Sequence, residues 1–172
     1  MSGTSELLRL LVREIAANDV KVDGFSFNDS LEREVWDSDN TMRPEVRDAL
    51  VAVADDFVEG LSISVQPEDI RLTGSLANYN WSKYSDVDLH VIVNFSDVDE
   101  DLDLVEGYFN SASALWNLRH DIKVKGYDVE IYVENAGEEH ISTGLYSVLN
   151  SEWIRVPPDE QGEKISFDAV KK

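Results

Sequence analysis

Residues 72–93 read LTGSLANYNWSKYSDVDLHVIV, and this stretch contains the clearest structural and chemical patterns of the chain. From Val87 onward, apolar and polar residues alternate, which is typical of a strand with one buried face. Asp86, Asp88 and His90 then share the opposite, polar face of that strand. The pattern predicts a strand that carries a pair of carboxylates out of the core.

The spacing of Asp86 and Asp88 suits the binding of one cation. Residues i and i+2 of a strand lie about 6–7 Å apart on one face, so the side chains of Asp86 and Asp88 can converge on one hard cation. Mg²⁺ prefers such oxygen ligands, and it relieves the repulsion between two like charges. Gly74 and Ser75 follow a short expected strand over residues 69–73, and they offer backbone N–H groups and a hydroxyl to a phosphate. Phosphoryl or nucleotidyl transfer requires both a metal-binding site and a phosphate-binding turn.

A third carboxylate is expected from another strand. Residues 127–134 alternate in the same way, with Asp128, Glu130 and Glu134 on the polar face. We choose Glu130, which is central in that strand, and keep Asp128 as the reserve. Near Asp86, it would complete a metal site or take the proton from an attacking hydroxyl.

The other elements follow from periodicity. Helical spacing of apolar residues predicts helices over residues 5–17 and 44–60, the second with Pro44 at its first position and Gly60 at its end. A third helix has Leu102, Val105, Phe109, Ala112 and Trp116 facing inward, and a last short helix covers about residues 138–149. Residues 18–40 form an irregular, anchored connection. The sum is an α+β (α/β-like) fold with a mixed sheet.

The 172 residues are enough for one compact domain, with 42% hydrophobic and 29% charged residues. We expect that domain over residues 1–155, with helices within 5–61 and the catalytic sheet within 67–150. Residues 156–172 have little apolar content, so we expect a disordered tail. The chain has no cysteine, which suits a reducing compartment.

The net charge of −20 is the unusual global property. Such a surface repels nucleic-acid backbones and anionic lipids, which argues against broad duplex binding and against a membrane partner. It also suits a high-salt cytoplasm, although ordinary acidic proteins look similar. The first helix is interrupted by charges, and no run of about 18 apolar residues occurs, so we expect neither a signal peptide nor a membrane span. The expected location is the cytoplasm.

The Gly74-Ser75 pair, a ten-residue gap and Asp86-Val87-Asp88-Leu89 together resemble the signature of the DNA polymerase beta-like nucleotidyltransferase superfamily. The longer stretch quoted above is similar to predicted nucleotidyltransferases of tailed phages and some bacteria. The segments RPEVRDALVAVADDFVEGL and GYDVEIYVEN are similar to flanking segments of those proteins. The resemblance covers about residues 5–153.

This resemblance implies a palm-like mixed sheet with helices on one side, and two divalent ions, Mg²⁺ or Mn²⁺. It implies that Ser75 contacts a nucleoside triphosphate, that Asp86 and Asp88 bind metal, and that Glu130 is the third acid. Larger superfamily members carry a further helical domain, and here only a tail follows residue 153, so the acceptor stays open. For a virus-encoded member, the location would be the host cytoplasm.

Several residues allow two interpretations, one functional and one structural. Ser75 either binds phosphate or caps the next helix. Lys83 either meets the triphosphate or is an exposed loop lysine, and Ser85 either orients the acidic pair or ends a turn. His90 acts directly or fills space beside the site. In the loop that follows Ser75, Tyr79 and Trp81 either stack on a base or anchor the loop on the core, and we favour anchoring.

The sequence thus predicts an enzyme that moves a nucleoside monophosphate from a nucleoside triphosphate to an acceptor hydroxyl, with release of pyrophosphate. Because of the charge, a small molecule or a protein is favoured over nucleic acid as the acceptor. The alternative is a catalytically inactive module of the same fold that binds a nucleotide or a partner protein. The three carboxylates argue against this alternative, because an inactive relative has no need to keep all of them.

Overall fold

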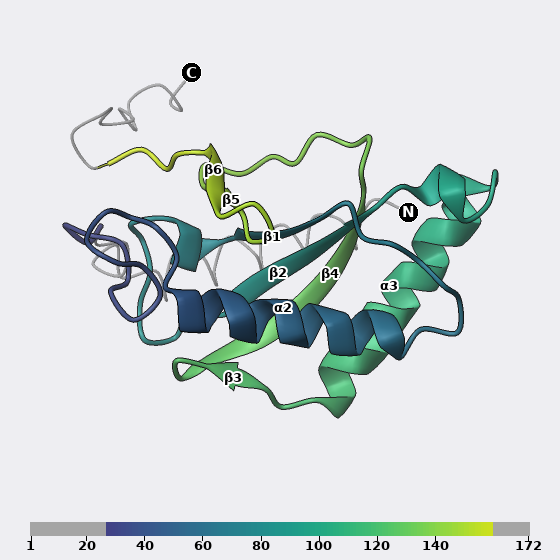
Figure 1. Cartoon of the computed structure of the whole chain (residues 1–172), viewed down its shortest axis with the longest axis horizontal. Helices are drawn as coiled ribbons and strands as arrows, with labels where there is room; N and C mark the ends of the chain where they lie inside the picture. The colour runs from purple at the N-terminus through teal and green to yellow at the C-terminus, as the bar shows by residue number, and fades with distance from the viewer. Residues whose placement is uncertain (1–26, 160–172) are drawn as a thin grey trace, which may run out of the picture.

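The computed structural model describes residues 27–159 (Figure 1). Within them the chain forms two α-helices, two 3₁₀ turns and one sheet of six strands. The elements in chain order are α2 (Pro44–Glu59), β1 (Asp69–Thr73), η2 (Ser75–Ala77), β2 (Val87–Val93), η3 (Phe95–Asp97), α3 (Leu102–Arg119), β3 (Lys123–Val124), β4 (Tyr127–Asn135), β5 (Leu145–Ser147) and β6 (Glu152–Arg155).

The sheet is mixed, and its strands lie in the order β3-β4-β2-β1-β5-β6. The central pair, β2 and β4, is parallel, because α3 crosses over between them. All other neighbouring strands are antiparallel. This arrangement confirms the expected α+β class with a mixed sheet.

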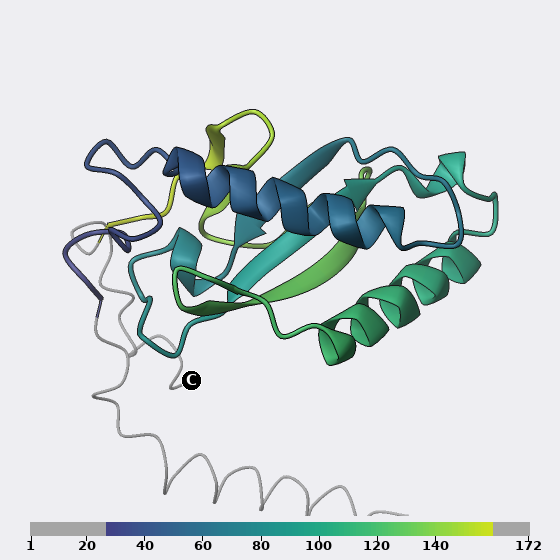
Figure 2. The same ribbon diagram turned by 60° about the horizontal axis from the view of Figure 1, so that its bottom comes forward.

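The core lies on one face of the sheet. Leu72 of β1, Leu89 of β2 and Ile131 of β4 are register neighbours, and each is at most 1% exposed. Helix α2 crosses in front of this face (Figures 1 and 2) and buries Leu50 and Phe57 against it. Because strand side chains alternate, Asp88 and Glu130 necessarily point to the opposite face, which α2 does not cover.

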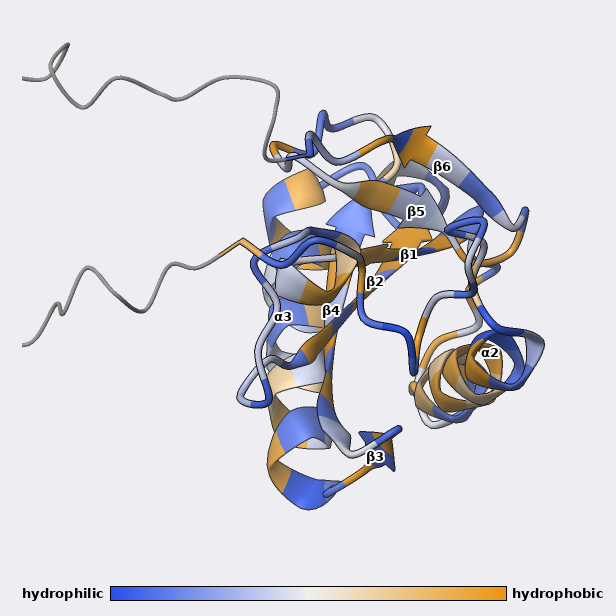
Figure 3. Cartoon of the chain, turned by 90° about the vertical axis from the view of Figure 1, so that its left-hand side faces the viewer, coloured by the Kyte–Doolittle hydropathy of each residue, from blue (hydrophilic) through white to orange (hydrophobic). Residues whose placement is uncertain are grey.

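Helix α3 joins the same core and also covers a sheet edge. Its Trp116 packs edge-on against Phe57 of α2, with ring centroids 6.3 Å apart. Its Asn117 donates to the carbonyl of Ile131 and accepts from the Ile131 N–H, at 3.0 and 2.8 Å. Figure 3 accordingly shows α3 alongside β4, at the side of the sheet away from β6. The amide of Asn117 thus satisfies backbone groups that the short β3 leaves unpaired.

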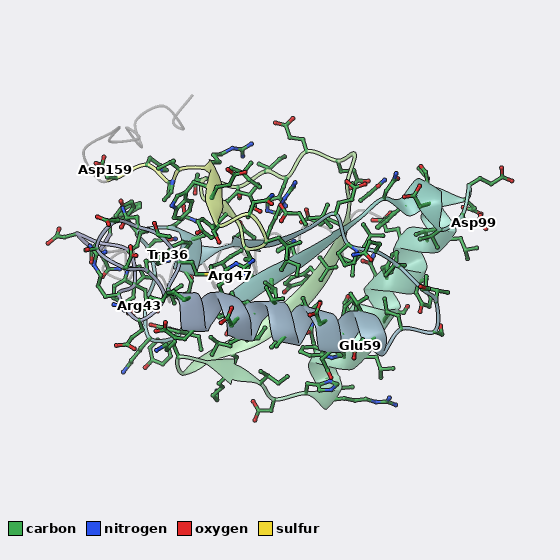
Figure 4. All side chains as sticks on the ribbon, viewed as in Figure 1. Trp36, Arg43, Arg47, Glu59, Asp99 and Asp159 are labelled. Atoms are coloured by element: carbon green, nitrogen blue, oxygen red, sulfur yellow. The ribbon has the colours of Figure 1, made fainter. Side chains whose placement is uncertain are left out.

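The β5–β6 hairpin is tied to the start of α2. Trp36 is fully buried, stacks on Trp153 at 4.6 Å and donates to the carbonyl of Leu76 at 2.7 Å. Arg47 of α2 reaches the carbonyls that follow β5, those of Val148 and Leu149, at 2.9 Å each (Figure 4). These contacts confirm that the described part of the connection before α2, residues 27–40, is irregular but anchored.

Most predicted elements are confirmed. Helix α2 begins at Pro44 and ends before Gly60, and β1 covers the expected residues. Strand β4 has the expected alternation, β2 has it from Val87 to Val91 and is then buried on both faces at Ile92, and α3 occupies the place of the third predicted helix. The predicted helix over 5–17, and most of the predicted tail, lie outside the described residues.

Two predictions are wrong. The short helix expected over residues 138–149 is a loop followed by β5, because Leu145–Ser147 pair with β1 and β6 instead of coiling. Leu102 does not face inward: it is the first residue of α3, and it is 42% exposed. Among residues 27–159, no helix is long and apolar enough to cross a membrane.

Candidate functional site

Strands β2 and β4 bring three acidic residues to the face opposite α2. Asp88 and Glu130 are direct partners in the parallel register of β2 and β4. Asp86 lies two residues before Asp88, immediately ahead of β2, so it shares that side of the strand. The structure therefore places the three carboxylates that the sequence singles out on one side of the sheet, although their oxygens are not all within 4.8 Å of one another, as the ligand atoms of His90, Glu134 and His140 are.

Their pKa values reflect this crowding. Partial burial raises the pKa of Asp86, and the negative charges of Glu130 and Asp128 raise it further. Burial also raises the pKa of Asp88; nearby His90 opposes this, whereas Glu130 and Asp86 add to it. The charged forms of Asp86 and Asp88 are thus destabilised by burial and by neighbouring carboxylates, and a cation beside them would relieve the repulsion.

Gly74 packs directly against this acidic cluster. It follows β1, with φ 79° and ψ −164°, a conformation that is essentially restricted to glycine. A Cβ atom at this position would lie 2.1 Å from Oδ2 of Asp88. The glycine is required both by its backbone angles and by the carboxylate beside it, so the turn and the metal-ligand candidates form one unit.

Ser75 and Ser85 close the loop between the glycine turn and Asp86. The Ser75 hydroxyl donates to the Ser85 hydroxyl at 2.7 Å, and Ser85 Oγ accepts from the Ser82 N–H at 2.9 Å. Gly74, and not Ser75, is the N-cap of η2, and no side chain caps that turn. The capping reading of Ser75 is therefore wrong, and Ser85 does end a turn. The Ser75–Ser85 contact holds both ends of the loop beside the acids.

The structure does not bring Lys83 to the acidic cluster. Lys83 is exposed, and its ammonium lies 4.9 Å from the ring centroid of Tyr84. The cation that bears on Asp86 is Lys123 of β3, which lowers the pKa of that acid. Sequence reasoning missed Lys123, because a two-residue strand has no pattern of its own.

The structure also distinguishes the two candidates for the third acid. Asp128 is bonded to Lys123 at 2.5 Å, so its charge is already paired. Glu130 has no cationic partner among the described residues, and its Oε2 accepts from the Tyr132 hydroxyl at 2.6 Å. Glu130 is thus the acid available to a metal beside Asp88.

The donor set fits Mg²⁺ or Mn²⁺. Asp86, Asp88 and Glu130 supply only carboxylate oxygens, the ligands that these hard cations prefer. Burial and neighbouring carboxylates, Glu130 in both cases, raise the pKa values of Asp86 and Asp88, so added positive charge would stabilise the cluster. On both grounds, the residues present suit a divalent cation.

Next to the acids lies a second polar cluster, which the sequence did not reveal. His90 of β2, Glu134 of β4 and His140 of the following loop place their ligand atoms within 4.8 Å of one another. His140 lies in a loop, 50 positions after His90, so no spacing rule connects them. The position of His90 on the polar face of its strand was the one sequence signal for this cluster.

The aromatic residues of the loop after η2 anchor it. Tyr79 and Trp81 are partly buried and pack against the core. The carbonyls of both accept from the Asn28 amide, at 2.9 and 2.7 Å, and the Trp81 indole donates to the carbonyl of Ser30 at 2.8 Å. The favoured reading, anchoring, is confirmed, and these contacts fix the loop that precedes Asp86.

A groove of about 680 Å³ lies elsewhere, between the C-terminal part of α2 and α3. Phe57, Leu115 and Trp116 line it, together with His120 and Arg119. It belongs to the helical layer, whereas the acids lie on the other face of the sheet. The size of the groove does not outweigh the chemistry of the acids, which have shifted pKa values and a glycine turn beside them.

Comparison with known protein families, with curated proteins and with solved structures finds no significant match to this chain. What the chain does must be inferred from its own residues: three carboxylates from two adjacent strands, a glycine turn in contact with one of them, and a serine pair that closes the loop between.

Proposed function

We propose that the chain is a metal-dependent nucleotidyltransferase with the palm-like sheet of the polymerase beta type. It would transfer a nucleoside monophosphate from a nucleoside triphosphate to an acceptor hydroxyl. The observation that carries this proposal is the meeting of Asp86, Asp88 and Glu130 beside Gly74. The resemblance of residues 72–93 to that superfamily supports it from the sequence side.

Asp86, Asp88 and Glu130 would hold the divalent ion. Bound there, Mg²⁺ would neutralise charge on the phosphates and help to orient them for in-line attack. Gly74 has no side chain, so the backbone of the turn is accessible to a phosphate next to Asp88. Ser75 would donate its hydroxyl to the triphosphate in place of its bond to Ser85.

In the reaction, the acceptor oxygen forms a bond to the α-phosphorus. The bond between that phosphorus and the bridging oxygen of the leaving pyrophosphate breaks. The hydroxyl proton passes to a carboxylate or to solvent, and Glu130 is the proposed acceptor when it is not engaged as a ligand. Its hydrogen bond from Tyr132 orients the carboxylate on the open side of β4.

The acceptor class follows from charge. With a net charge of −20, the chain repels polyanions, so a hydroxyl on a small molecule or a protein is favoured over an RNA or DNA end. The cations near the acids are few, and Lys123 is already paired with Asp128. The triphosphate would therefore depend on the metal for charge neutralisation more than on basic side chains.

The test uses nucleoside triphosphates labelled at the α-phosphate, with Mg²⁺ and a cell lysate as the source of acceptors. The wild-type chain should transfer the label and release pyrophosphate. The double variant Asp86→Asn, Asp88→Asn should lose at least about 10²–10³-fold in rate, because the charge stabilisation depends on these ligands. Asp55→Asn, on the exposed side of α2, removes one negative charge away from the acids and should not change transfer. Equal transfer by the double variant and the wild type would eliminate the proposal.

One observation favours the second candidate, a nucleotide- or protein-binding module without activity. Small-molecule sites are usually concave, and the groove of about 680 Å³ lies between α2 and α3, away from the acids. Calorimetry with nucleoside triphosphates, with and without Mg²⁺, separates the candidates. Tight binding without pyrophosphate release, retained in the double variant, would support the module.

A further inference from the structure

The polar face of the sheet continues beyond the acids into a histidine-containing cluster. His90 is two residues after Asp88 on β2, and Glu134 is two residues after Tyr132, the register partner of His90. His140 comes from the loop between β4 and β5. The three side chains thus come from two strands and a loop that meet at one point.

The contacts within this cluster are short. Nδ1 of His90 lies 2.5 Å from Oε1 of Glu134, and Nδ1 of His140 lies 2.6 Å from the same oxygen. The side chains of His90, Glu134 and His140 are only 12%, 21% and 19% exposed. Two imidazole nitrogens therefore converge on a single carboxylate oxygen in a largely water-excluded position.

Nδ1 of His90 is held by an ion-pair contact only. It lies 2.5 Å from Oε1 of Glu134 without the geometry of a hydrogen bond, and no other hydrogen-bond partner reaches this buried atom among residues 27–159. A cation placed between the nitrogen and the carboxylate would bind both of them.

One carboxylate serves both imidazoles. Oε1 of Glu134 faces Nδ1 of His90 and Nδ1 of His140. Arg71, the register partner of His90 on β1, does not supply the countercharge, because it is bonded to Asp69 at 3.0 Å.

We propose that His90, Glu134 and His140 form a second metal site that binds Zn²⁺. Two imidazole nitrogens and one carboxylate oxygen are a donor set for a borderline transition metal, not for Mg²⁺. Three protein ligands leave a fourth position for water or a substrate group. Zn²⁺ binding would replace the short nitrogen–oxygen contacts with bonds of about 2.0–2.2 Å from each ligand atom to the metal.

The site would tie the β4–β5 loop to the sheet close to the acidic cluster. After His140 the loop reaches Thr143, whose hydroxyl bonds to the Asn78 side chain at 2.6 Å, and Gly144, whose carbonyl accepts from Thr73 at 3.1 Å. Tyr132 provides a second link, because its ring stacks on His90 at 5.1 Å while its hydroxyl holds Glu130. A metal at His140 would therefore stiffen the surroundings of Gly74 and Glu130.

The chain offers a clean test, because it has three histidines and no cysteine. The untagged full chain, freed of metal with a chelator, is titrated with Zn²⁺ against a chromogenic competitor in excess Mg²⁺, which occupies the carboxylate site. We expect one tightly bound Zn²⁺ per chain, and d–d absorption bands when Co²⁺ is used instead. His90→Ala, His140→Ala and Glu134→Gln should each weaken Zn²⁺ binding by at least about 100-fold, more than is typical for an outer-shell partner.

Two controls identify the site. His120→Ala removes the third histidine, which stacks on Trp116 of α3, and should bind Zn²⁺ as the wild type does. Asp86→Asn with Asp88→Asn should also leave Zn²⁺ binding unchanged, so failure of this inference is distinguishable from failure of the proposed function. Circular dichroism of the metal-free variants checks their fold, and His140 in its loop is the substitution expected to preserve it best. Wild-type Zn²⁺ affinity in folded His140→Ala, or an equal loss in His120→Ala, would overturn the proposal.

Discussion

Replacing Asp88 with asparagine should make the metal-free protein more stable, although it removes a group on which the proposed function depends. Asp88 is half-buried, and burial together with the charges of Glu130 and Asp86 raises its pKa, against the opposing effect of His90. A carboxyl whose pKa is raised on folding binds protons more readily in the folded state. Its ionisation therefore costs stability above the folded pKa, and this cost disappears as the pH falls below the unfolded value.

The size of the effect follows from the spacing of the acids. Asp86 and Asp88 lie about 6–7 Å apart on one side of a strand. At that distance the Coulomb repulsion is about 2.5 kcal/mol for an effective dielectric constant of 20 and about 0.6 kcal/mol in bulk water. Because Asp86 is exposed, the lower half of this interval applies. We therefore expect Asp88→Asn to raise the free energy of unfolding of the metal-free protein by about 1 kcal/mol. For a chain of this size, that corresponds to a rise in Tm of about 2–4 °C.

The assay is thermal unfolding followed by circular dichroism, with a chelator present, for wild type, Asp88→Asn and Asp55→Asn. Asp55 is an exposed residue of α2, so its variant controls for the change in net charge. The gain of Asp88→Asn over this control should be present near pH 7 and shrink as the pH falls through the raised pKa of Asp88. Added Mg²⁺ should stabilise the wild type and not Asp88→Asn. A lower Tm for Asp88→Asn than for Asp55→Asn, without metal, would refute the reasoning.

Two further predictions concern the fold around the site. Gly74→Ala should lower the free energy of unfolding by more than Gly126→Ala, because both glycines have positive φ (79° and 86°) but only a Cβ at Gly74 would meet the Asp88 carboxylate. The positive φ alone costs an alanine about 1–3 kcal/mol at each position. If denaturant titration finds that both variants lose the same free energy of unfolding, the close contact between Gly74 and Asp88 is not supported. Tyr127→Phe should cost about 1–3 kcal/mol, since it removes the 2.6 Å hydrogen bond to Oε2 of buried Glu32 and leaves only Oε1 of that carboxylate bonded, to the Glu34 N–H. Tyr84→Phe, at a ring that is 80% exposed, should change stability by less than about 0.5 kcal/mol, and similar losses for both variants would contradict this account.

The parts of the fold that the sequence predicts are those with a local period. Strand β2 alternates buried and half-buried residues from Val87 to Val91, and α2 has both a proline at its start and a glycine at its end. In β5, by contrast, all three residues are buried, so no alternation distinguishes it from a helix. Its strand character comes from pairing with β1, more than 70 positions earlier, and no local pattern records such a contact.

The same distinction applies to the sites. Asp86 and Asp88 are close in sequence, so their spacing alone predicted a shared face, and the two similar strands suggested Glu130. The cluster of His90, Glu134 and His140 depends on a loop path that brings residue 140 back over the sheet. The pairing of Lys123 with Asp128 likewise depends on the tight turn between β3 and β4. Contacts that loops create are not predictable from periodicity.

The most direct test of the central claim is a crystal of the full chain grown with Mn²⁺ and a non-hydrolysable nucleoside triphosphate. Anomalous scattering from Mn²⁺ locates the ion independently of the surrounding density. The account predicts an anomalous peak in contact with carboxylate oxygens of Asp86 and Asp88, with the triphosphate against the Gly74 turn. Mn²⁺ bound away from both aspartates, or a triphosphate seated in the groove between α2 and α3 instead, would contradict it.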